Sequence, residues 1–469
     1  MASRSSKLTA VAAAFLLVFY WRCFDIWFYQ DDFGWLHLAP VRSIQELVHS
    51  FFFAKAHGSV RVLSTNAYFM LFGSVFGLNP LPFHLAVFGA ATGVLLLIPA
   101  VVRRLGASDW GGFAAQVVWL GNSCVAVSLC WISIFNQTMC LFLLLAAFAC
   151  LMRYSETGGR RWLALQWAAF ILGFGALEVN VVYPALALGW AWWFARPLCR
   201  KIAPMFAVSA AYAAVQFLLS PPESSGPYAL VMGWHIFGTV WKYVEMAAGP
   251  IRLAHFLGLP KGLALASTLL MVGAAVWAVW RKRKAGWLAA AWFLLPLMPY
   301  LPLRDHVMDY YLTVPAAGLA MLAGLAWSRA GALTVALYLA FHLPAAWMTV
   351  SWHRERSHRA RDVVEAVVEI HRNRPQQAIL LTGVDTATFE AAIADLAFEL
   401  YGIKNVRLAP GAERTIRDAG GLAPLYVMPL DKALAEVEAG RAAVYDISGP
   451  RVRNVTALSL RLWKAGSFP

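Results

Sequence analysis

Two adjacent carboxylates, Asp31 and Asp32, follow the first apolar segment of the chain, in the stretch FYQDDFGWLH. Neighbouring acids repel each other, which raises the pKa of one of them toward the working pH and suits it to general-base chemistry. Among aromatic neighbours the two would titrate as a coupled pair. The alternative is that both are solvated loop acids. We predict that Asp31 and Asp32 are the catalytic residues.

Other polar residues stand alone in apolar surroundings. Glu178 lies in GFGALEVNVVYP, and Arg304, Asp305 and His306 lie in LRDHVMDYY. Such residues are costly at membrane depth unless they line a cavity or pair, so each is a functional candidate. The alternatives are a Glu178 solvated by lipid headgroups, an Arg304 neutralised by Asp305, and a His306 that is only structural.

The composition shows what kind of molecule must position these residues. The chain has 469 residues, of which 60% are hydrophobic and 14% charged, whereas soluble proteins have about 25% charged residues. Its repeated apolar runs, many with Trp or Tyr near their ends, are typical of membrane-spanning helices. The net charge of +14 is concentrated in short clusters between these runs. Membrane topology explains those clusters, and we exclude a nucleic-acid partner.

The positions of the basic clusters predict the topology. The expected spans are 8–24, 82–102, 112–130, 137–152, 162–177, 179–195, 202–219, 262–280, 286–301, 311–327 and 331–350. Alternate connections carry Arg103/Arg104, then Arg153 with Arg160/Arg161, then Arg196 with Arg200/Lys201, then Arg281–Lys284, then Arg329. By the positive-inside rule these connections face the cytoplasm. About eleven spans then leave the C-terminus outside.

The first outer loop is expected to be long, about residues 25–81. Counting the apolar segment Val62–Gly77 as a span would invert every later loop, so we expect it and Ser43–Phe53 to be helices along the outer surface. This loop contains Asp31 and Asp32.

The composition changes after residue 352. A basic, partly amphipathic helix is expected over 353–374, followed by strands at 377–385, 405–410, 424–430 and 442–448 with helices between them. This alternation predicts a small soluble α/β domain over 353–469, outside the cytoplasm. Residues 1–352 would form the transmembrane domain. The fold class is therefore a mainly α, polytopic membrane protein with a small C-terminal α/β domain.

Several motifs, taken in order, resemble a known superfamily. The acidic pair, then RVLSTNAYFMLFG, then NPLPFHLAVFGAATGVLLLIPAVVRRLG are similar to the N-terminal half of GT-C glycosyltransferases. The similarity is greatest to the protein O-mannosyltransferase-like branch and its bacterial relatives. WISIFNQ, Glu178 and MDYYLTVPAAGLAML extend the resemblance over about residues 8–350.

The resemblance implies an enzyme that moves a sugar from a polyprenyl-phosphate-linked donor to an acceptor hydroxyl on the extracytoplasmic face, with inversion. It also implies an integral protein of the bacterial inner membrane. The catalytic carboxylate carries over to Asp31 and Asp32. The family's lysine before Glu178 is replaced by Leu177, so its phosphate-binding role would fall to another cation such as Arg304. The expected substrate-binding residues are Glu178, Arg304, His306, Arg61, Asn136 and Tyr310.

Other functions remain open at this stage. A transporter or flippase of a lipid-linked sugar or another small anionic solute would also place charged residues in a polytopic protein. A non-catalytic membrane scaffold is a third reading. No cofactor is certain. Asp31 and Asp32 could hold a divalent cation, although no further outer acids are spaced to complete its shell. The expected partners are the bilayer, the lipid-linked donor and an extracytoplasmic acceptor.

Overall fold

The computed structural model describes residues 4–38, 43–52, 61–219, 221, 225–417, 422–449 and 451–468. Parts of the expected first outer loop, 39–42 and 53–60, lie outside this range. The chain divides into two compact units, Met1–Asp25 with Val41–Ser351 and Ile26–Pro40 with Trp352–Pro469. We call them the helical unit and the sheet unit.

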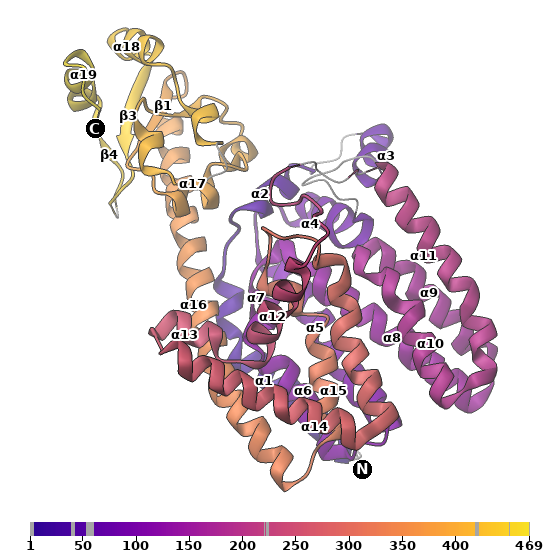
Figure 1. The fold of residues 1–469 in the computed structure, drawn as a ribbon. Helices are drawn as coiled ribbons and strands as arrows, with labels where there is room; N and C mark the ends of the chain where they lie inside the picture. The colour runs from indigo at the N-terminus through magenta and orange to yellow at the C-terminus, as the bar shows by residue number, and fades with distance from the viewer. Residues whose placement is uncertain are drawn as a thin grey trace. The chain divides into compact units, whose positions relative to one another are not determined.

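The helical unit consists of α-helices joined by short 3-10 segments and one π-helical segment (Figure 1). Its elements are α1 (Arg4–Phe19), η1 (Trp21–Asp25), α3 (Ile44–Phe52), η2 (Val62–Ala67), α4 (Tyr68–Phe76), α5 (Leu81–Arg104), α6 (Asp109–Gly121), α7 (Ser123–Cys130), η3 (Ile132–Ile134), α8 (Phe135–Thr157), α9 (Arg160–Ala176), η4 (Glu178–Val182), α10 (Tyr183–Phe194), η5 (Arg196–Leu198), α11 (Cys199–Leu219), α12 (His235–Ala248), α13 (Ile251–Leu257), α14 (Lys261–Leu294), η6 (Leu295–Tyr300), η7 (Asp309–Leu312), α15 (Ala316–Leu325) and α16 (Arg329–Asn373).

Several of these helices are long and apolar enough to cross a membrane. Within the described ranges there are five such segments, and the bent pair α6 and α7 makes a sixth if it counts as one span. The five segments are Leu81–Arg104, Ile132–Thr157, Arg196–Leu219, Lys261–Tyr300 and Arg329–Asn373. The protein is therefore an integral membrane protein. The other expected spans form shorter helices, such as α10 with 12 residues, so eleven spans stay a prediction.

Two expected helix boundaries differ from the structure. The expected spans 262–280 and 286–301 are joined in α14, which is interrupted by a kink at Arg283 (φ 45°, ψ −117°). The expected span 331–350 and the basic helix 353–374 form one helix, α16, of 45 residues. No glycine or proline separates them in the sequence, so the helix continues although its composition changes.

Glycine allows two helices to touch through their backbones. A Cβ on Gly111 of α6 would lie 2.4 Å from the carbonyl oxygen of Gly324 in α15, and a Cβ on Gly324 would lie 2.6 Å from the carbonyl oxygen of Gly111. Small residues are the usual means of close helix packing in membranes. The pair therefore fixes how α15 packs against α6.

The sheet unit contains a four-stranded sheet with strand order β2-β1-β3-β4 (Figure 1). β1 pairs in parallel with β2 and β3, and β3 pairs antiparallel with β4. The unit also includes the C-terminal end of α16. Its remaining elements are α2 (Asp31–Leu36), β1 (Ala378–Thr382), α17 (Thr386–Ala392), η8 (Ala397–Tyr401), β2 (Val406–Leu408), η9 (Ala412–Thr415), η10 (Ala423–Tyr426), α18 (Leu430–Glu438), β3 (Ala442–Asp446), β4 (Arg453–Asn454) and α19 (Thr456–Lys464).

Three of the four expected strands are present, and the expected strand 424–430 is wrong. Residues Ala423–Tyr426 form a 3-10 helix, and only an isolated bridge joins Val427 to Leu408. Pro424 and Pro429 have no N–H group to donate to a ladder, which explains why this apolar run does not extend the sheet.

Candidate active site

Asp31 and Asp32 occupy the first turn of α2, but their side chains differ in accessibility. Asp32 is fully buried, and its Oδ2 accepts a hydrogen bond from the backbone N–H of Tyr29 at 3.2 Å. Asp31 is half-buried. A carboxylate must reach solvent or substrate to accept a proton from an acceptor hydroxyl, so Asp31 is the better placed of the two.

The segment that carries both acids is held within the sheet unit by hydrogen bonds to distant parts of the chain. The backbone N–H of Trp27 donates to Ser357 Oγ at 3.1 Å, and that of Gln30 donates to the carbonyl of Ala391 at 2.9 Å. Tyr29 Oη lies 2.5 Å from His353 Nδ1. These bonds connect the acidic segment to α16 and α17.

One residue of this segment has an uncommon backbone conformation. Gln30, directly before Asp31, has φ 58° and ψ −135°, a region that residues other than glycine seldom adopt. Its neighbours Phe28, Tyr29 and Phe33 are buried, and its N–H is bonded to α17. Burial and hydrogen bonding therefore hold the turn in a conformation that local preference alone would not select.

Within the helical unit, the structure brings together two predicted site residues, Arg61 and Glu178. Arg61 precedes η2 and Glu178 begins η4, and their side chains form two parallel hydrogen bonds, Nε to Oε2 at 3.0 Å and Nη2 to Oε1 at 2.8 Å. The two side chains are 20% and 29% exposed. This fork-to-carboxylate geometry fixes the plane of the guanidinium.

The pair stays charged near neutral pH. Burial alone would raise the pKa of Glu178, but the charge and hydrogen bonds of Arg61 lower it below its ordinary value. Burial likewise opposes the charge on Arg61, but Glu178 raises the pKa of the guanidinium above its ordinary value. Glu178 is therefore an anion with a fixed partner, Arg61.

Aromatic side chains lie beside this ion pair. The rings of Tyr300 and Tyr311 stack with centroids 3.8 Å apart, and Gln137 Nε2 donates to Tyr300 Oη at 3.1 Å. The charge of Arg61 interacts with both phenols. A cation beside stacked tyrosines offers both a charged group and flat apolar faces, the combination that a sugar phosphate requires.

His306 lies in the same aromatic group. Its ring centroid is 4.4 Å from that of Tyr228 and 5.9 Å from that of Tyr311. Burial lowers the pKa of His306 below its ordinary value, so the ring is neutral at pH 7. Its Nε2 is buried and has no hydrogen-bond partner among the described residues. A neutral imidazole with an unused nitrogen can bind a hydroxyl group as donor or acceptor.

Arg304 differs from Arg61 in its surroundings. It pairs with the adjacent Asp305 at 2.9 Å, and the two side chains are 54% and 58% exposed. No contact in the described part of the chain joins Arg304 to Arg61 or Glu178. The structure therefore contains the local ion pair with Asp305 that was the alternative, and Arg304 is a surface cation.

Asn136 is part of the WISIFNQ stretch, and Tyr310 contacts that stretch. Asn136 is 3% exposed, and its Oδ1 is buried without a partner among the described residues. The ring of Tyr310 meets the edge of Trp131 at a centroid distance of 6.1 Å. Two motifs that are far apart in the sequence, WISIFNQ and MDYYLTVP, are therefore in contact.

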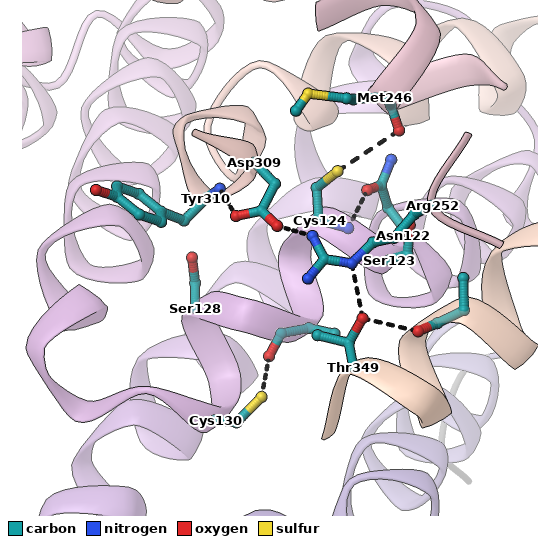
Figure 2. A network of polar contacts seen from close by, with 12 residues as sticks. Asn122, Ser123, Cys124, Ser128, Cys130, Met246, Arg252, Asp309, Tyr310 and Thr349 are labelled. Carbon is teal, nitrogen blue, oxygen red and sulfur yellow. Dashed lines mark hydrogen bonds and ion pairs between the residues drawn. The ribbon is translucent and has the colours of Figure 1, made fainter. Parts of the chain in front are cut away.

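A second ion pair, between the half-buried side chains of Arg252 of α13 and Asp309 of η7, was not expected from the sequence (Figure 2). Arg252 Nε also donates to Thr349 Oγ1 of α16 at 2.8 Å, and Asp309 Oδ1 accepts from the backbone N–H of Tyr310 at 2.7 Å. Burial lowers the pKa of Arg252. The pair links α13, η7 and α16 and orients the backbone of Tyr310.

The same network includes the break between α6 and α7, where the chain bends by 67°. Asn122 caps α7 by accepting from the backbone N–H of Cys124 at 2.8 Å (Figure 2). Its Nδ2 donates to the carbonyl of Ala247 at 3.1 Å. A lone Arg252 in the apolar stretch AAGPIRLAHFLG was the signal available in the sequence, because an isolated cation in such a stretch needs a partner.

Two features of the structure bear on where a polar substrate or a metal would bind. An apolar cavity of about 520 Å³ lies among α14, α15 and α16. Its lining is almost entirely apolar and carries no charged side chain, so it does not suit a sugar phosphate. No group of three or more His, Cys, Asp or Glu side chains in the described part of the chain could hold a metal ion, so a divalent cation at Asp31 and Asp32 has no support.

Comparison with known proteins identifies the fold. No protein-family model matches the sequence, and no curated protein matches it. Among solved structures, the chain is similar to ArnT from Cupriavidus metallidurans in the apo state, with a TM-score of 0.50 and 13% identity over 95% of this chain and 93% of that one. The structure of that ArnT bound to undecaprenyl phosphate matches at a TM-score of 0.47 with the same identity and coverage.

ArnT is a GT-C glycosyltransferase. The chain therefore has a fold similar to that of ArnT. This confirms, at the level of fold, the resemblance inferred from the motifs.

Proposed function

We propose that the protein is a glycosyltransferase that moves a sugar from a polyprenyl-phosphate-linked donor to an acceptor hydroxyl on the extracytoplasmic face of the membrane, with inversion. The observation that carries this proposal is the GT-C fold, which extends over nearly the whole chain. The donor class and the side of the membrane come from the sequence resemblance and the charge distribution.

In the proposed reaction Asp31 is the general base. Its carboxylate accepts the proton of the acceptor hydroxyl while the acceptor oxygen bonds to the anomeric carbon and the bond from that carbon to the phosphate oxygen breaks. Asp32 positions the turn through its bond to Tyr29. A single displacement without a covalent intermediate inverts the anomeric configuration.

The phosphate that departs carries charge and needs a cation. Of the two candidates, Arg61 is the better choice because Glu178 holds its guanidinium in a fixed plane, whereas Arg304 is on the surface. The bonds to Glu178 occupy two of the five N–H groups of Arg61. Glu178 is thus a positioning residue, and Tyr310, Asn136 and His306 are the proposed contacts for the hydroxyl groups of the substrates.

One observation favours the transporter or flippase alternative. Broken helices with polar groups at the break are common at the binding sites of transporters, and α6 and α7 form such a broken pair. Against it, Arg61, Glu178, Arg304 and His306 lie outside the long apolar segments. The two functions differ in outcome, because a flippase moves the lipid-linked sugar unchanged and a transferase releases the carrier.

A direct test is to incubate the purified protein with a panel of polyprenyl-phosphate sugars and to measure free polyprenyl phosphate. At least one donor should lose its sugar to an acceptor or, slowly, to water. Translocation of an intact labelled donor across vesicles, with no release of the carrier from any donor, would assign the protein to the alternative class.

A further inference from the structure

Four consecutive cations, Arg281–Lys284, lie at the turn between two apolar helical segments of α14. The helix axis is interrupted at Arg283, whose φ of 45° and ψ of −117° are not helical. Apolar runs lie on both sides, Leu263–Trp280 before the turn and Trp287–Leu294 after it. A turn between two apolar helices of an integral membrane protein lies at the level of the lipid headgroups.

Three of these four cations line a cavity of about 430 Å³ together with tryptophans from two helices. The lining consists of Trp193 of α10 and Trp280, Arg281, Arg283, Lys284 and Trp287 of α14. Trp280 is 76% exposed and Trp287 is 60% exposed. Exposed indole rings are characteristic of the membrane interface, where their apolar body contacts acyl chains and their N–H group stays near the headgroups.

The charge of this turn is not neutralised by an ion pair in the described part of the chain. At another basic turn, Arg103 pairs with Asp109 at 2.9 Å and Arg104 pairs with Glu156 at 2.7 Å. By contrast, none of the cations of Arg281–Lys284 has an acidic partner among the residues that the structure describes. One of their charged groups, the guanidinium of Arg281, lies over the ring of Trp277 at 5.3 Å.

We propose that this cavity binds the headgroup of an anionic phospholipid. The phosphate would lie among the guanidinium and ammonium groups of Arg281, Arg283 and Lys284, and the start of the acyl chains would contact Trp280 and Trp287. Charge-assisted hydrogen bonds from arginine suit a phosphate, and juxtamembrane basic clusters attract anionic lipids. Tryptophans at the cavity rim favour a lipid over a soluble anion, because only a lipid brings apolar chains to cover them.

The proposal is tested on the full-length protein in a neutral detergent. The protein is titrated with phosphatidylglycerol, with phosphatidylcholine of the same chain length and with inorganic phosphate, and bound ligand is counted by native mass spectrometry. Phosphatidylglycerol should bind, and phosphatidylcholine and phosphate should not compete at equal concentration. The double variant R281Q/R283Q should bind phosphatidylglycerol about tenfold more weakly or worse, since each cation near a membrane surface contributes about 1 kcal/mol to the attraction.

A matched control is the double variant R160Q/R161Q, which removes two exposed cations at the start of α9, one of them likewise over a tryptophan ring. It should bind phosphatidylglycerol as the wild type does, and R281K/R283K should retain most of the affinity. The melting temperature without lipid checks that R281Q/R283Q is folded, and Lys284→Gln serves as a second variant. Equal binding of phosphatidylcholine, displacement by free phosphate, equal loss in the control, or no loss in R281Q/R283Q and Lys284→Gln would each overturn the proposal.

Discussion

The two acids of the QDDF stretch are adjacent in sequence but have different surroundings. Asp32 is fully buried and accepts the N–H of Tyr29, whereas Asp31 is half-buried. The sequence predicted that the pair matters but left open which acid is the base. Burial distinguishes them, and the two roles lead to different effects of substitution.

We expect Asp31→Asn to lower donor turnover by about 10²-fold or more in a protein that still folds, as on removal of a general base. Asp32→Ala should instead lower the free energy of unfolding by about 1–3 kcal/mol, because it leaves the buried N–H of Tyr29 without its acceptor. Turnover and thermal unfolding of both variants are the measurements. Wild-type turnover in a folded Asp31→Asn protein would remove Asp31 from the mechanism.

The ion pair between Arg61 and Glu178 predicts an acid limb in stability. The pKa of Glu178 is lower in the folded state than its ordinary value. The pair therefore stabilises the fold above the unfolded-state pKa of about 4.3, and this contribution is lost as pH falls through the folded-state pKa. Arg61 stays charged throughout this window.

Unfolding measured from pH 6 to pH 3 should accordingly show a smaller loss of stability in Glu178→Gln than in the wild type. At pH 6 the variant should be less stable than the wild type, because Arg61 loses its anionic partner. Asp305→Asn is the control, since its carboxylate is exposed. Parallel acid limbs in wild type and Glu178→Gln would contradict the role of the pair.

At the scale of elements, η7 is held by the ion pair of Arg252 with Asp309. Both side chains are about one-fifth exposed, at 19% and 21%. Breaking such a pair leaves one half-buried charge without its ionic partner, which costs more than removing both charges together.

Asp309→Asn should therefore destabilise the protein by roughly 2–4 kcal/mol, and the double variant R252M/D309N should recover part of that loss. Chemical denaturation of the two single variants and the double variant measures the coupling. Additive effects in the double variant would show that the two side chains do not interact.

The residue types within each segment explain which helices and strands could be predicted from the sequence. Long apolar runs predicted helices such as α5, α8 and α11, because the length and the hydropathy of a run are properties of the local sequence. The expected strand over 424–430 failed because Pro424 and Pro429 interrupt its hydrogen bonding, which outweighs its apolar character. The continuity of α16 could not be inferred, because a change of composition at Trp352 does not end a helix when no glycine or proline lies at the change.

The sequence predicted candidate residues of the site, but it did not predict which of them contact one another. Glu178 and Arg61 were both candidates, but their pairing depends on how η2 packs near η4, over a separation of 117 residues. Arg304 was a candidate from the sequence with a local ion pair to Asp305 as the alternative, and the structure shows that pair on the surface. Arg252 lies in a stretch with no expected span, and only its isolation in an apolar context indicated it.

At the scale of the whole molecule, the charge pattern predicts the topology. A reporter fused after Asn373, where α16 ends, should lie outside the cytoplasm, and one inserted within Arg281–Lys284 should lie inside. Protease protection or a compartment-specific reporter measures both positions. If the two report the same side, the number of spans between them is even, and the proposed extracytoplasmic reaction loses its support.

The central claim is that the protein breaks the bond between a sugar and a polyprenyl phosphate. The most direct measurement is the release of free polyprenyl phosphate from a labelled polyprenyl-phosphate sugar by purified wild-type protein, with a folded Asp31→Asn protein as the matched control. Release by the wild type that falls about 10²-fold or more in Asp31→Asn is the predicted result. Equal release by the two proteins, or no release from any donor of the panel by a folded wild-type protein, would contradict it.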